Sequence, residues 1–530
     1  MSDLPWLTIL IVLPLVGAAL VGFLPAAEDS ARPKQMAVGF SLLTLAVGIA
    51  IAAQYDTDGG MQLTETHEWI GAFGVNYAVG VDGLGLLLIL LTVSLVPIVM
   101  VAGWFDADDS LVRDRARSSA PASEKSPGTE GIRAFFAWAL ALESLSLAVF
   151  AATDVFFFYV VFEATLIPAY FLIGGFGRDG RAGAALKFLM FQLAGGLVLL
   201  AAVVGLYVVS AQAGQPSYLL SDLAALDIGT SAGRWLFAGF FIAFAIKAPL
   251  FPVHTWLADT TQQATPGTSV LLVCVLDKIG TFGMLRFCLG LFPEASQWAT
   301  PVVMILALIS IVYGALVAIG QDDVLRLIGL TSLSHFGFIT VGVFAMSSQG
   351  GSGAILYMVN HGIGTAALFL LAGYLIRRRG TSLISEMGGL EKVTPVLAGL
   401  FLVAGLATLG LPGLSPFVSE FLVLLSAFDY AWYVGAVAVS AIVLAPIYVL
   451  WLYQRAMTGP TPPDAEGTPD LGRRELGAVV PLIGALLLFG FYPMPLLDIS
   501  NPTVEDLMER VGVSDLPPVV PPGDTSEGGE

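Results

Sequence analysis

The chain has 530 residues, of which 56% are hydrophobic and only 12% are charged, and its mean hydropathy is +0.83. An average soluble domain carries about 25% Asp, Glu, Lys and Arg. A water-soluble globular protein of this length would need more polar surface than 64 charged residues supply, and the abundant apolar runs exclude a disordered chain. The formal net charge of −18 argues against nucleic acid as a partner, because binding to phosphates needs an excess of Lys and Arg.

Cofactor and metal sites are not expected in this chain. Its two cysteines, Cys274 and Cys288, lie in one apolar stretch and cannot make a four-cysteine iron–sulfur or structural zinc site. Only four histidines are present, and they are scattered along the sequence. No glycine-rich dinucleotide or phosphate-binding motif follows a strand-like segment, so we expect no nucleotide pocket.

Apolar stretches long enough to cross a membrane recur along the whole chain. About 20 mostly apolar residues suffice for one spanning helix. Fourteen such stretches occur, near 5–24, 35–54, 81–103, 132–151, 155–174, 186–210, 233–256, 268–292, 301–320, 327–346, 353–376, 395–427, 433–454 and 476–497. The first stretch lacks a basic leader and is too long for a signal peptide. The expected fold class is therefore an all-α integral membrane protein with about 14 transmembrane helices.

The spacing of these stretches divides the chain into four parts. Residues 1–131 hold three transmembrane helices and a polar cytoplasmic linker at 105–131 that is rich in Ser and Pro. Two five-helix units follow at 132–292 and 293–455, and residues 456–530 hold the last transmembrane helix and an acidic C-terminal tail. The linker and the tail are predicted to have little structure of their own.

The positions of the basic residues predict the orientation in the membrane. The loops that follow odd-numbered stretches contain 18 of the 23 Lys and Arg residues, whereas the other loops and both tails carry mainly acidic residues. Positively charged loops stay in the cytoplasm. Both termini are therefore predicted on the non-cytoplasmic side, which agrees with an even number of helices.

Several ionisable residues lie deep inside apolar stretches, where each costs at least ~2.5–3.5 kcal/mol on insertion scales. Glu143 and Glu163 are both roughly 12 Å deep by helical rise, and Lys247 and Lys278 fall near the midplane of their stretches by the same count. Such groups could exchange protons through water, and their titrations would be coupled. The alternative is that they form structural ion pairs that only hold helices together. The full set is Glu143, Glu163, Lys247, Lys278, Glu420, His335 and His361.

Two stretches are interrupted by proline pairs beside a buried charge. Pro249 and Pro252 follow Lys247, and Pro412 and Pro416 precede Glu420. Proline breaks the helical hydrogen-bond ladder, and the interrupted stretches are five apart, so they run in opposite directions. We therefore predict two inverted five-helix repeats, each with a broken helix, an arrangement typical of ion pathways. Ordinary helix kinks are the alternative.

Four runs of sequence resemble the antiporter-like subunits of respiratory complex I, the NADH:quinone oxidoreductase, over roughly 135–455. They occur in the expected order, namely Asp154-Val-Phe-Phe-Phe-Tyr-Val-Val-Phe-Glu163 continuing to Leu166-Ile-Pro168, Lys247-Ala-Pro-Leu-Phe-Pro-Val-His254-Thr-Trp-Leu, Asp277-Lys278-Ile-Gly with Leu285-Arg286-Phe, and Gln321-Asp-Asp-Val-Leu-Arg326 leading to Ser334-His335-Phe-Gly. Glu420 stands where the L and N branches usually carry lysine, and the chain ends soon after its last stretch. Both features resemble the M branch.

The resemblance implies a proton relay without redox chemistry in this chain. It assigns Glu163 and Lys247 to the input, Lys278 to the centre, His335 to the relay and Glu420 to the outlet. Secondary candidates are Glu143, His254 and His361. Two features depart from the family, namely Asp277 in place of an apolar residue and the stretch Ala258-Asp-Thr-Thr-Gln-Gln, which lacks the usual Pro and second His. Gly195-Gly196 predicts close helix packing rather than a binding loop.

The same resemblance implies partners and location. NADH, flavin, iron–sulfur clusters and quinone are expected in partner subunits, and the chain is expected between the antiporter-like subunits L and N, in contact with lipids of the bacterial plasma membrane. Electron transfer in those partners would drive the proton movement. The nearest rivals are a subunit of a multisubunit Na+/H+ antiporter or of a membrane-bound hydrogenase, and a scaffold whose buried charges only hold helices together.

Overall fold

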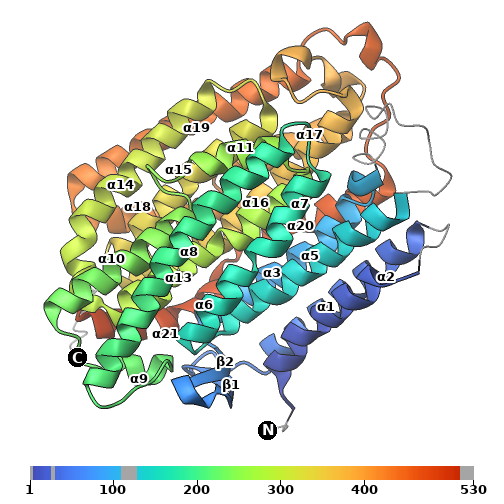
Figure 1. Ribbon diagram of the computed structural model, residues 1–530. Coiled ribbons are helices and arrows are strands. Elements are labelled where there is room, and N and C mark those ends of the chain that lie inside the picture. Colours follow the sequence, from blue (N-terminus) through green and yellow to red (C-terminus); the bar gives the residue numbers. More distant parts are fainter. Residues whose placement is uncertain (1–3, 26–29, 109–127, 514–530) are drawn as a thin grey trace, which may run out of the picture.

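The computed structural model describes residues 4–25, 30–108 and 128–513. Within these residues the chain is a bundle of long, roughly parallel helices (Figure 1). Most of the predicted linker and the end of the predicted acidic tail lie outside the described residues.

Eleven spans among the described residues are long and apolar enough to cross a membrane. They consist of α2 (Ala31–Ala52), α3 (Gly83–Ala102), α5 (Gly128–Ala151), α6 with α7 (Val155–Ala164, Leu166–Phe176), α8 (Arg181–Gln212), α12 to η3 (Pro266–Val270, Leu271–Leu276, Lys278–Gly283, Met284–Leu289), α14 (Pro293–Ile319), α15 (Val324–Phe344), α16 (Ser348–Arg379), α19 (Trp432–Met457) and α20 (Arg473–Phe491). The other three predicted stretches correspond to α1 (Trp6–Gly22), α10 with α11 (Thr230–Lys247, Thr255–Gln263) and α17 with α18 (Pro395–Thr408, Ser415–Tyr430). The all-α membrane fold is confirmed.

Two helices are interrupted at the proline pairs. α10 ends at Lys247, and seven residues that include both prolines separate it from α11. α17 ends at Thr408, and Pro416 lies in the first turn of α18, where a missing backbone donor costs nothing. Both interruptions therefore place a buried ionisable residue close to a free helix end.

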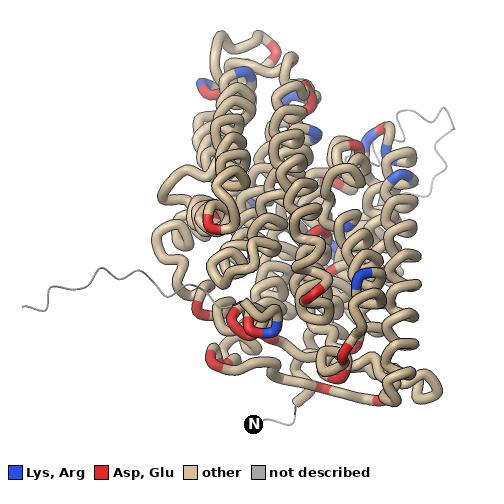
Figure 2. The backbone as a smooth tube through the Cα atoms, turned by 90° about the vertical axis from the view of Figure 1, so that its left-hand side faces the viewer, with Lys and Arg blue, Asp and Glu red and all other residues tan. Residues whose placement is uncertain are grey.

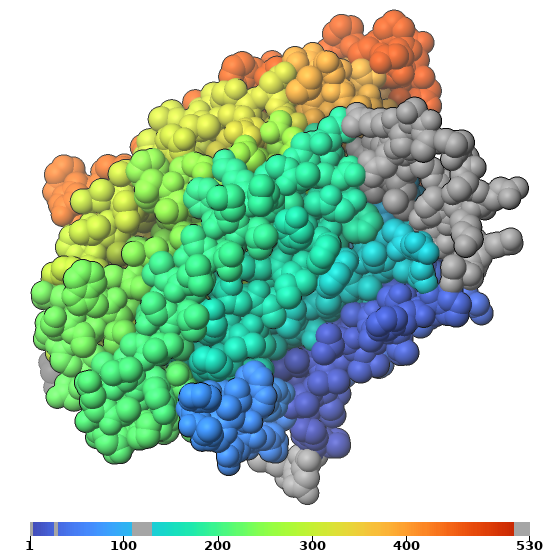
Figure 3. All heavy atoms as spheres, in the orientation of Figure 1, coloured from blue at the N-terminus to red at the C-terminus, as the bar shows by residue number. Residues whose placement is uncertain are grey.

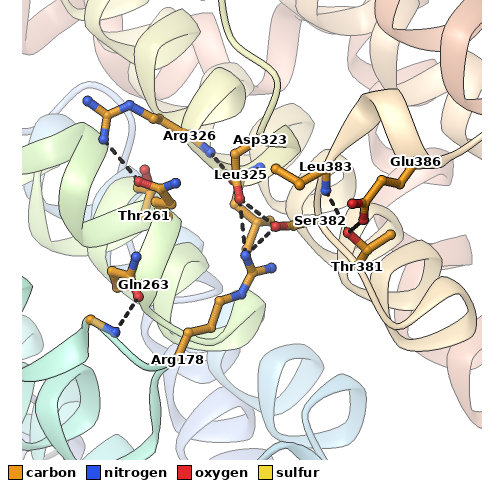
Figure 4. Close-up of polar contacts among 12 residues, drawn as sticks. Arg178, Thr261, Gln263, Asp323, Leu325, Arg326, Thr381, Ser382, Leu383 and Glu386 are labelled. Carbon is orange, nitrogen blue, oxygen red and sulfur yellow. Dashed lines mark hydrogen bonds and ion pairs between the residues drawn. The ribbon is translucent and has the colours of Figure 1, made fainter.

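The two predicted five-helix units share one local arrangement at opposite ends of the bundle. Asp154 caps α6 by accepting the backbone N–H groups two and three residues later, and it forms a β-bridge with Leu219 after α8. Asp323 does the same for α15 and bridges to Leu383 after α16. The span of α6 and α7 runs from Asp154 to Arg178, which donates to Asp323 at 3.1 Å (Figure 4). The two caps thus lie at opposite ends of one span, as two inverted repeats require.

The sequence did not predict a β-hairpin or the final helix. Strands β1 (Gln62–Ile70) and β2 (Val75–Val81) pair antiparallel and lie beside the short helix α9 (Leu220–Ala224) at one end of the molecule (Figure 3). The tail prediction was wrong for residues up to 511, because α21 (Met494–Val511) is a helix that packs on α3 and α16. The buried residues of α21 recur every three or four positions and so form one face of the helix, which packs against the bundle. The opposite face is polar, and this polar composition led to the prediction of a tail with little structure. The remaining 3-10 turns are η1 (Gly71–Phe73), η4 (Ile384–Glu386), η5 (Leu390–Lys392) and η6 (Pro463–Ala465).

Charge and burial follow the expected pattern. Most Lys and Arg residues of the described chain gather at the end away from the N-terminus (Figure 2). The most apolar stretches of the spans Pro266–Leu289, Val324–Phe344 and Ser348–Arg379 are fully buried, whereas α2 and α20 are largely exposed at the periphery. The three central spans carry Lys278, His335 and His361, so these groups lie inside the bundle rather than against lipid.

Candidate functional site

The predicted input pair, Glu163 and Lys247, lies where α6, α8 and α10 meet. Glu163 is the penultimate residue of α6, and its carboxylate occupies the space that a side chain on Gly196 of α8 would fill. Lys247 is fully buried at the end of α10, and its Nζ donates to Thr165 Oγ1 at 3.4 Å and lies 4.9 Å from the Phe162 ring centroid. The charges of Glu163 and Lys247 act on each other without a direct hydrogen bond. The two groups are therefore neighbours across one short gap.

The centre of the site is a lysine–histidine pair. Lys278, fully buried, lies with its Nζ 2.6 Å from His361 Nδ1 and 4.3 Å from the Phe336 ring centroid. It begins α13 between two π-helical segments, η2 and η3. π-helical turns are uncommon and often occur at functional sites. A lysine and an imidazole at this distance can share one proton, because only one of the two nitrogens needs to hold it.

The chain of polar groups continues to the second broken helix. The rings of His361 and His335 are 5.1 Å apart, and His335 Nδ1 lies 2.7 Å from Tyr357 Oη. The charge of Glu420 acts on both Tyr357 and Tyr448. Glu420 is 7% exposed and lies against Gly410, where a side chain would collide with the carboxylate. The half-buried Glu163 and the buried Glu420 thus lie at the two ends of this set of ionisable groups.

Two secondary candidates lie apart from this line. Glu143 on α5 is 1% exposed, and neither carboxylate oxygen has a hydrogen-bond partner among the described residues. No charged group among the described residues lies close enough to act on its carboxyl group. His254 packs between the rings of Phe251 and Tyr313, at centroid distances of 5.9 and 5.2 Å. The contacts of His254 are those of a packed aromatic residue, whereas His361 lies in the centre of the line.

The structure adds residues that sequence reasoning did not place in the site. Tyr357 bridges His335 toward Glu420, Thr165 contacts Lys247, and Gly196 makes room for Glu163. Tyr357 precedes His361 by four residues, one helical turn, and this spacing was the available signal. Gly195 packs against Ile246 of α10 as expected for a close helix contact, but its neighbour Gly196 contacts a site residue.

Proton transfer is the chemistry that these groups support. Carboxylate, amine, imidazole and phenol side chains each bind and release a proton, and coupled groups pass it along as neighbouring charges change. Within the part of the chain that the structure describes, no three His, Cys, Asp or Glu residues are grouped to hold a metal ion.

Known proteins share this sequence and architecture. Residues 152–445 match the family model described as NADH:quinone oxidoreductase/Mrp antiporter, transmembrane. NADH-quinone oxidoreductase subunit M of Mycobacterium tuberculosis is 50% identical, covering 98% of this chain and 97% of that protein. The corresponding subunit of Rhodobacter capsulatus is 36% identical over 95% of this chain and 96% of that protein.

Solved structures give the same result for the fold. A chain of respiratory complex I from Thermus thermophilus with bound NADH is 33% identical, with a TM-score of 0.84, covering 96% of this chain and all of that one. A chain of the Mrp complex from Dietzia sp. DQ12-45-1b shares the fold, with a TM-score of 0.81 and 21% identity, covering 96% of this chain and 100% of that one. The chain therefore belongs to the NADH:quinone oxidoreductase/Mrp antiporter transmembrane family, and within it to the M subunits of NADH-quinone oxidoreductase.

Proposed function

We propose that this chain is a membrane-arm subunit of NADH:quinone oxidoreductase that carries protons across the membrane. The observation that carries the proposal is the line of buried ionisable groups between the two broken helices. Lys278 contacts His361, whose ring lies against that of His335. Charge interactions extend this centre to Glu163 and Lys247 at one end and to Glu420 at the other. Structural ion pairs alone would not account for the centre of this line, because its members meet there as lysine–histidine and histidine–tyrosine contacts rather than as matched opposite charges.

The proposed relay uses each group as a temporary proton carrier. Glu163 receives a proton and passes it toward Lys247, and Lys278 with His361 holds the next one at the centre. His335 and Tyr357 then connect the centre to Glu420, which releases the proton. When a proton enters at Glu163, the charge on Lys247 is no longer balanced, and this favours release further along the line.

The energy must come from partner subunits. Moving one charge across a membrane takes about 2.3 kcal/mol per 100 mV, and this sequence contains no hydrolase or nucleotide motif. We propose that NADH oxidation and quinone reduction, with flavin and iron–sulfur clusters in the partners, drive the relay. The chain then contributes to a translocase while holding no redox centre itself.

The proposed setting is the bacterial plasma membrane, between antiporter-like subunits L and N. The gathering of Lys and Arg at the end away from the N-terminus supports both termini on the non-cytoplasmic side (Figure 2). Attachment of a membrane-impermeant thiol reagent to a cysteine introduced at Asp58, between α2 and β1, tests this orientation. Labelling from outside intact cells is expected, and labelling only in inverted vesicles would reverse the topology.

The decisive experiment separates a relay from a scaffold. Glu163→Gln and Lys247→Ala, singly and together, are introduced into the assembled complex, and NADH-driven proton uptake is measured in inverted membrane vesicles with a pH-sensitive dye. We expect intact assembly and a loss of uptake of at least tenfold in the double variant. Glu130→Gln, an exposed change on α5, is the control. Undiminished uptake by an assembled double variant would show that these charges only hold helices together.

A further inference from the structure

Asp277 is a buried carboxylate in the centre of the site that the relay above leaves unused. It stands between the π-helical segment η2 and α13, directly before Lys278, and it is fully buried. Neither of its carboxylate oxygens has a hydrogen-bond partner among the described residues. A buried carboxylate without such partners is costly unless opposite charge or water compensates it, so its surroundings decide what it does.

The packing of Gly280 shows which way the Asp277 side of the helix faces. A Cβ on Gly280 would lie 2.6 Å from the Phe244 carbonyl oxygen and would also overlap the backbone of Ala248. The helix therefore presents Gly280 directly to the end of α10, where Lys247 is the residue before Ala248. Asp277 lies three positions before Gly280 and so shares its face.

Lys278 faces a different neighbour. Adjacent helical residues point about 100° apart, and Lys278 lies against His361 of α16. The charge of Asp277 nevertheless acts on both lysines, with the influence of Lys247 the larger. Asp277 thus lies on the path between an input lysine and a central lysine that have no direct contact with each other among the described hydrogen bonds.

We propose that Asp277 carries the proton between Lys247 and Lys278, as an additional relay group in the proton path. The inference rests on the proposed function and deepens it. The Lys247 ammonium gives its proton, through water, to the Asp277 carboxylate, which leaves a neutral amine and a neutral carboxyl group. The carboxyl group then protonates the neutral amine of Lys278 and returns to its charged form. One proton enters and one leaves, and no other reactant is needed.

The titratable groups around Asp277 lie on its own span and on the elements packed against it. The buried ones are Cys274, Lys278, Cys288, Lys247, Glu143, His335, Tyr357, His361 and Tyr374, and the half-buried Arg286 lies on the same span. Lys247 and Lys278 are the two basic groups whose charge acts on Asp277. Glu143, the other buried carboxylate in this set, has no charged group among the described residues acting on it, so Asp277 is the carboxylate that both lysines influence.

The test uses the assembled complex with Asp277→Asn, which keeps the shape and removes the proton-binding site, and Asp277→Glu, which restores a carboxylate. The control is Ser269→Ala, a fully buried residue of α12 whose hydroxyl also has no hydrogen-bond partner among the described residues. Proton uptake in vesicles is measured beside redox-induced infrared difference spectra, which report the carbonyl stretch of a carboxyl group that becomes protonated. A purely structural role would not produce that band.

We expect Asp277→Asn to lower proton uptake at least fivefold and to lose one carboxyl band, Asp277→Glu to regain at least half of the uptake with a shifted band, and the control to match wild type. An assembled Asn variant with uptake within twofold of wild type and an unchanged spectrum would overturn the inference. If the Asp277→Asn complex does not assemble, the Asp277→Glu complex provides the test. A carboxyl band in its infrared difference spectrum at the wild-type position would contradict the proposal. The two proposals fail in different ways. If the Glu163→Gln/Lys247→Ala complex loses proton uptake but the Asp277→Asn complex is normal, only the inference about Asp277 is overturned. If the Glu163→Gln/Lys247→Ala complex keeps full uptake, the proposed function itself is overturned.

Discussion

Gly196 offers a way to move one carboxylate of the relay without changing its chemistry. In Gly196→Ala the new methyl group would overlap the Glu163 carboxylate, and even the more distant oxygen, Oε2, would lie 2.7 Å from it, against at least 3.4 Å for an ordinary contact. The carboxylate must therefore retreat by on the order of 1 Å. A misplacement of about 1 Å can cost roughly a hundredfold in rate, so we expect proton uptake to fall by roughly tenfold to a hundredfold.

The fold should tolerate this change. Alanine is more favourable than glycine inside a helix by roughly 0.5–1 kcal/mol, and α8 is helical at Gly196. Gly183→Ala on the same helix is the matched control, because nothing lies within 4 Å of its Cβ. NADH-driven uptake is measured in inverted vesicles at equal complex content. Wild-type uptake by an assembled Gly196→Ala complex would refute the argument that the position of the Glu163 carboxylate matters.

Two further changes test the packing around the relay. Asp82 precedes the α3 span and pairs with Arg286 at 2.6 Å; burial raises its pKa, but the charge and hydrogen bonds of Arg286 outweigh burial and hold the pKa below its usual 3.8. Asp82→Asn should lower the free energy of unfolding by about 3–5 kcal/mol. A carboxyl group whose pKa is lower in the folded than in the unfolded state stabilises the fold above its unfolded pKa, so the difference in Tm from wild type should stay constant above about pH 4 and shrink as the pH falls through the folded pKa. A Tm difference that grows on acidification would contradict this. Tyr357→Phe removes the hydroxyl that lies 2.7 Å from His335 and should lower proton uptake several-fold. The control is Tyr374→Phe on the same helix, which should leave uptake unchanged because the Tyr374 hydroxyl has no hydrogen-bond partner among the described residues. Equal effects of the two changes would exclude a specific role for Tyr357.

The membrane spans could be read from the sequence because they are local features. A helix in lipid must satisfy its own backbone hydrogen bonds, so an apolar run of sufficient length is itself the structural unit. All fourteen predicted stretches correspond to a helix or to consecutive helical segments. The prolines at 249, 252, 412 and 416 act locally in the same way, and the interruptions occur at these prolines.

Other elements escaped prediction because their signal was weak or non-local. The hairpin of β1 and β2 lies between apolar stretches, and its strands, of nine and seven residues, are partly polar. α21 has a polar composition, and its apolar face becomes evident only when it packs on α3 and α16. The π-helical turns beside Lys278 have no sequence signature of their own.

The sequence by itself indicated most of the buried ionisable groups of the site, because a charge inside an apolar stretch is costly wherever it stands. Glu163, however, is half-buried, and the fully buried Asp277 was not among the predicted groups. Only the tertiary structure decided which of these groups meet. The pairing of Lys278 with His361, the bridge through Tyr357 and the separation of Glu143 from the line all depend on how each helix is rotated against its neighbours. That rotation is set by packing between residues far apart in the chain, such as the close contact of Gly280 with the end of α10.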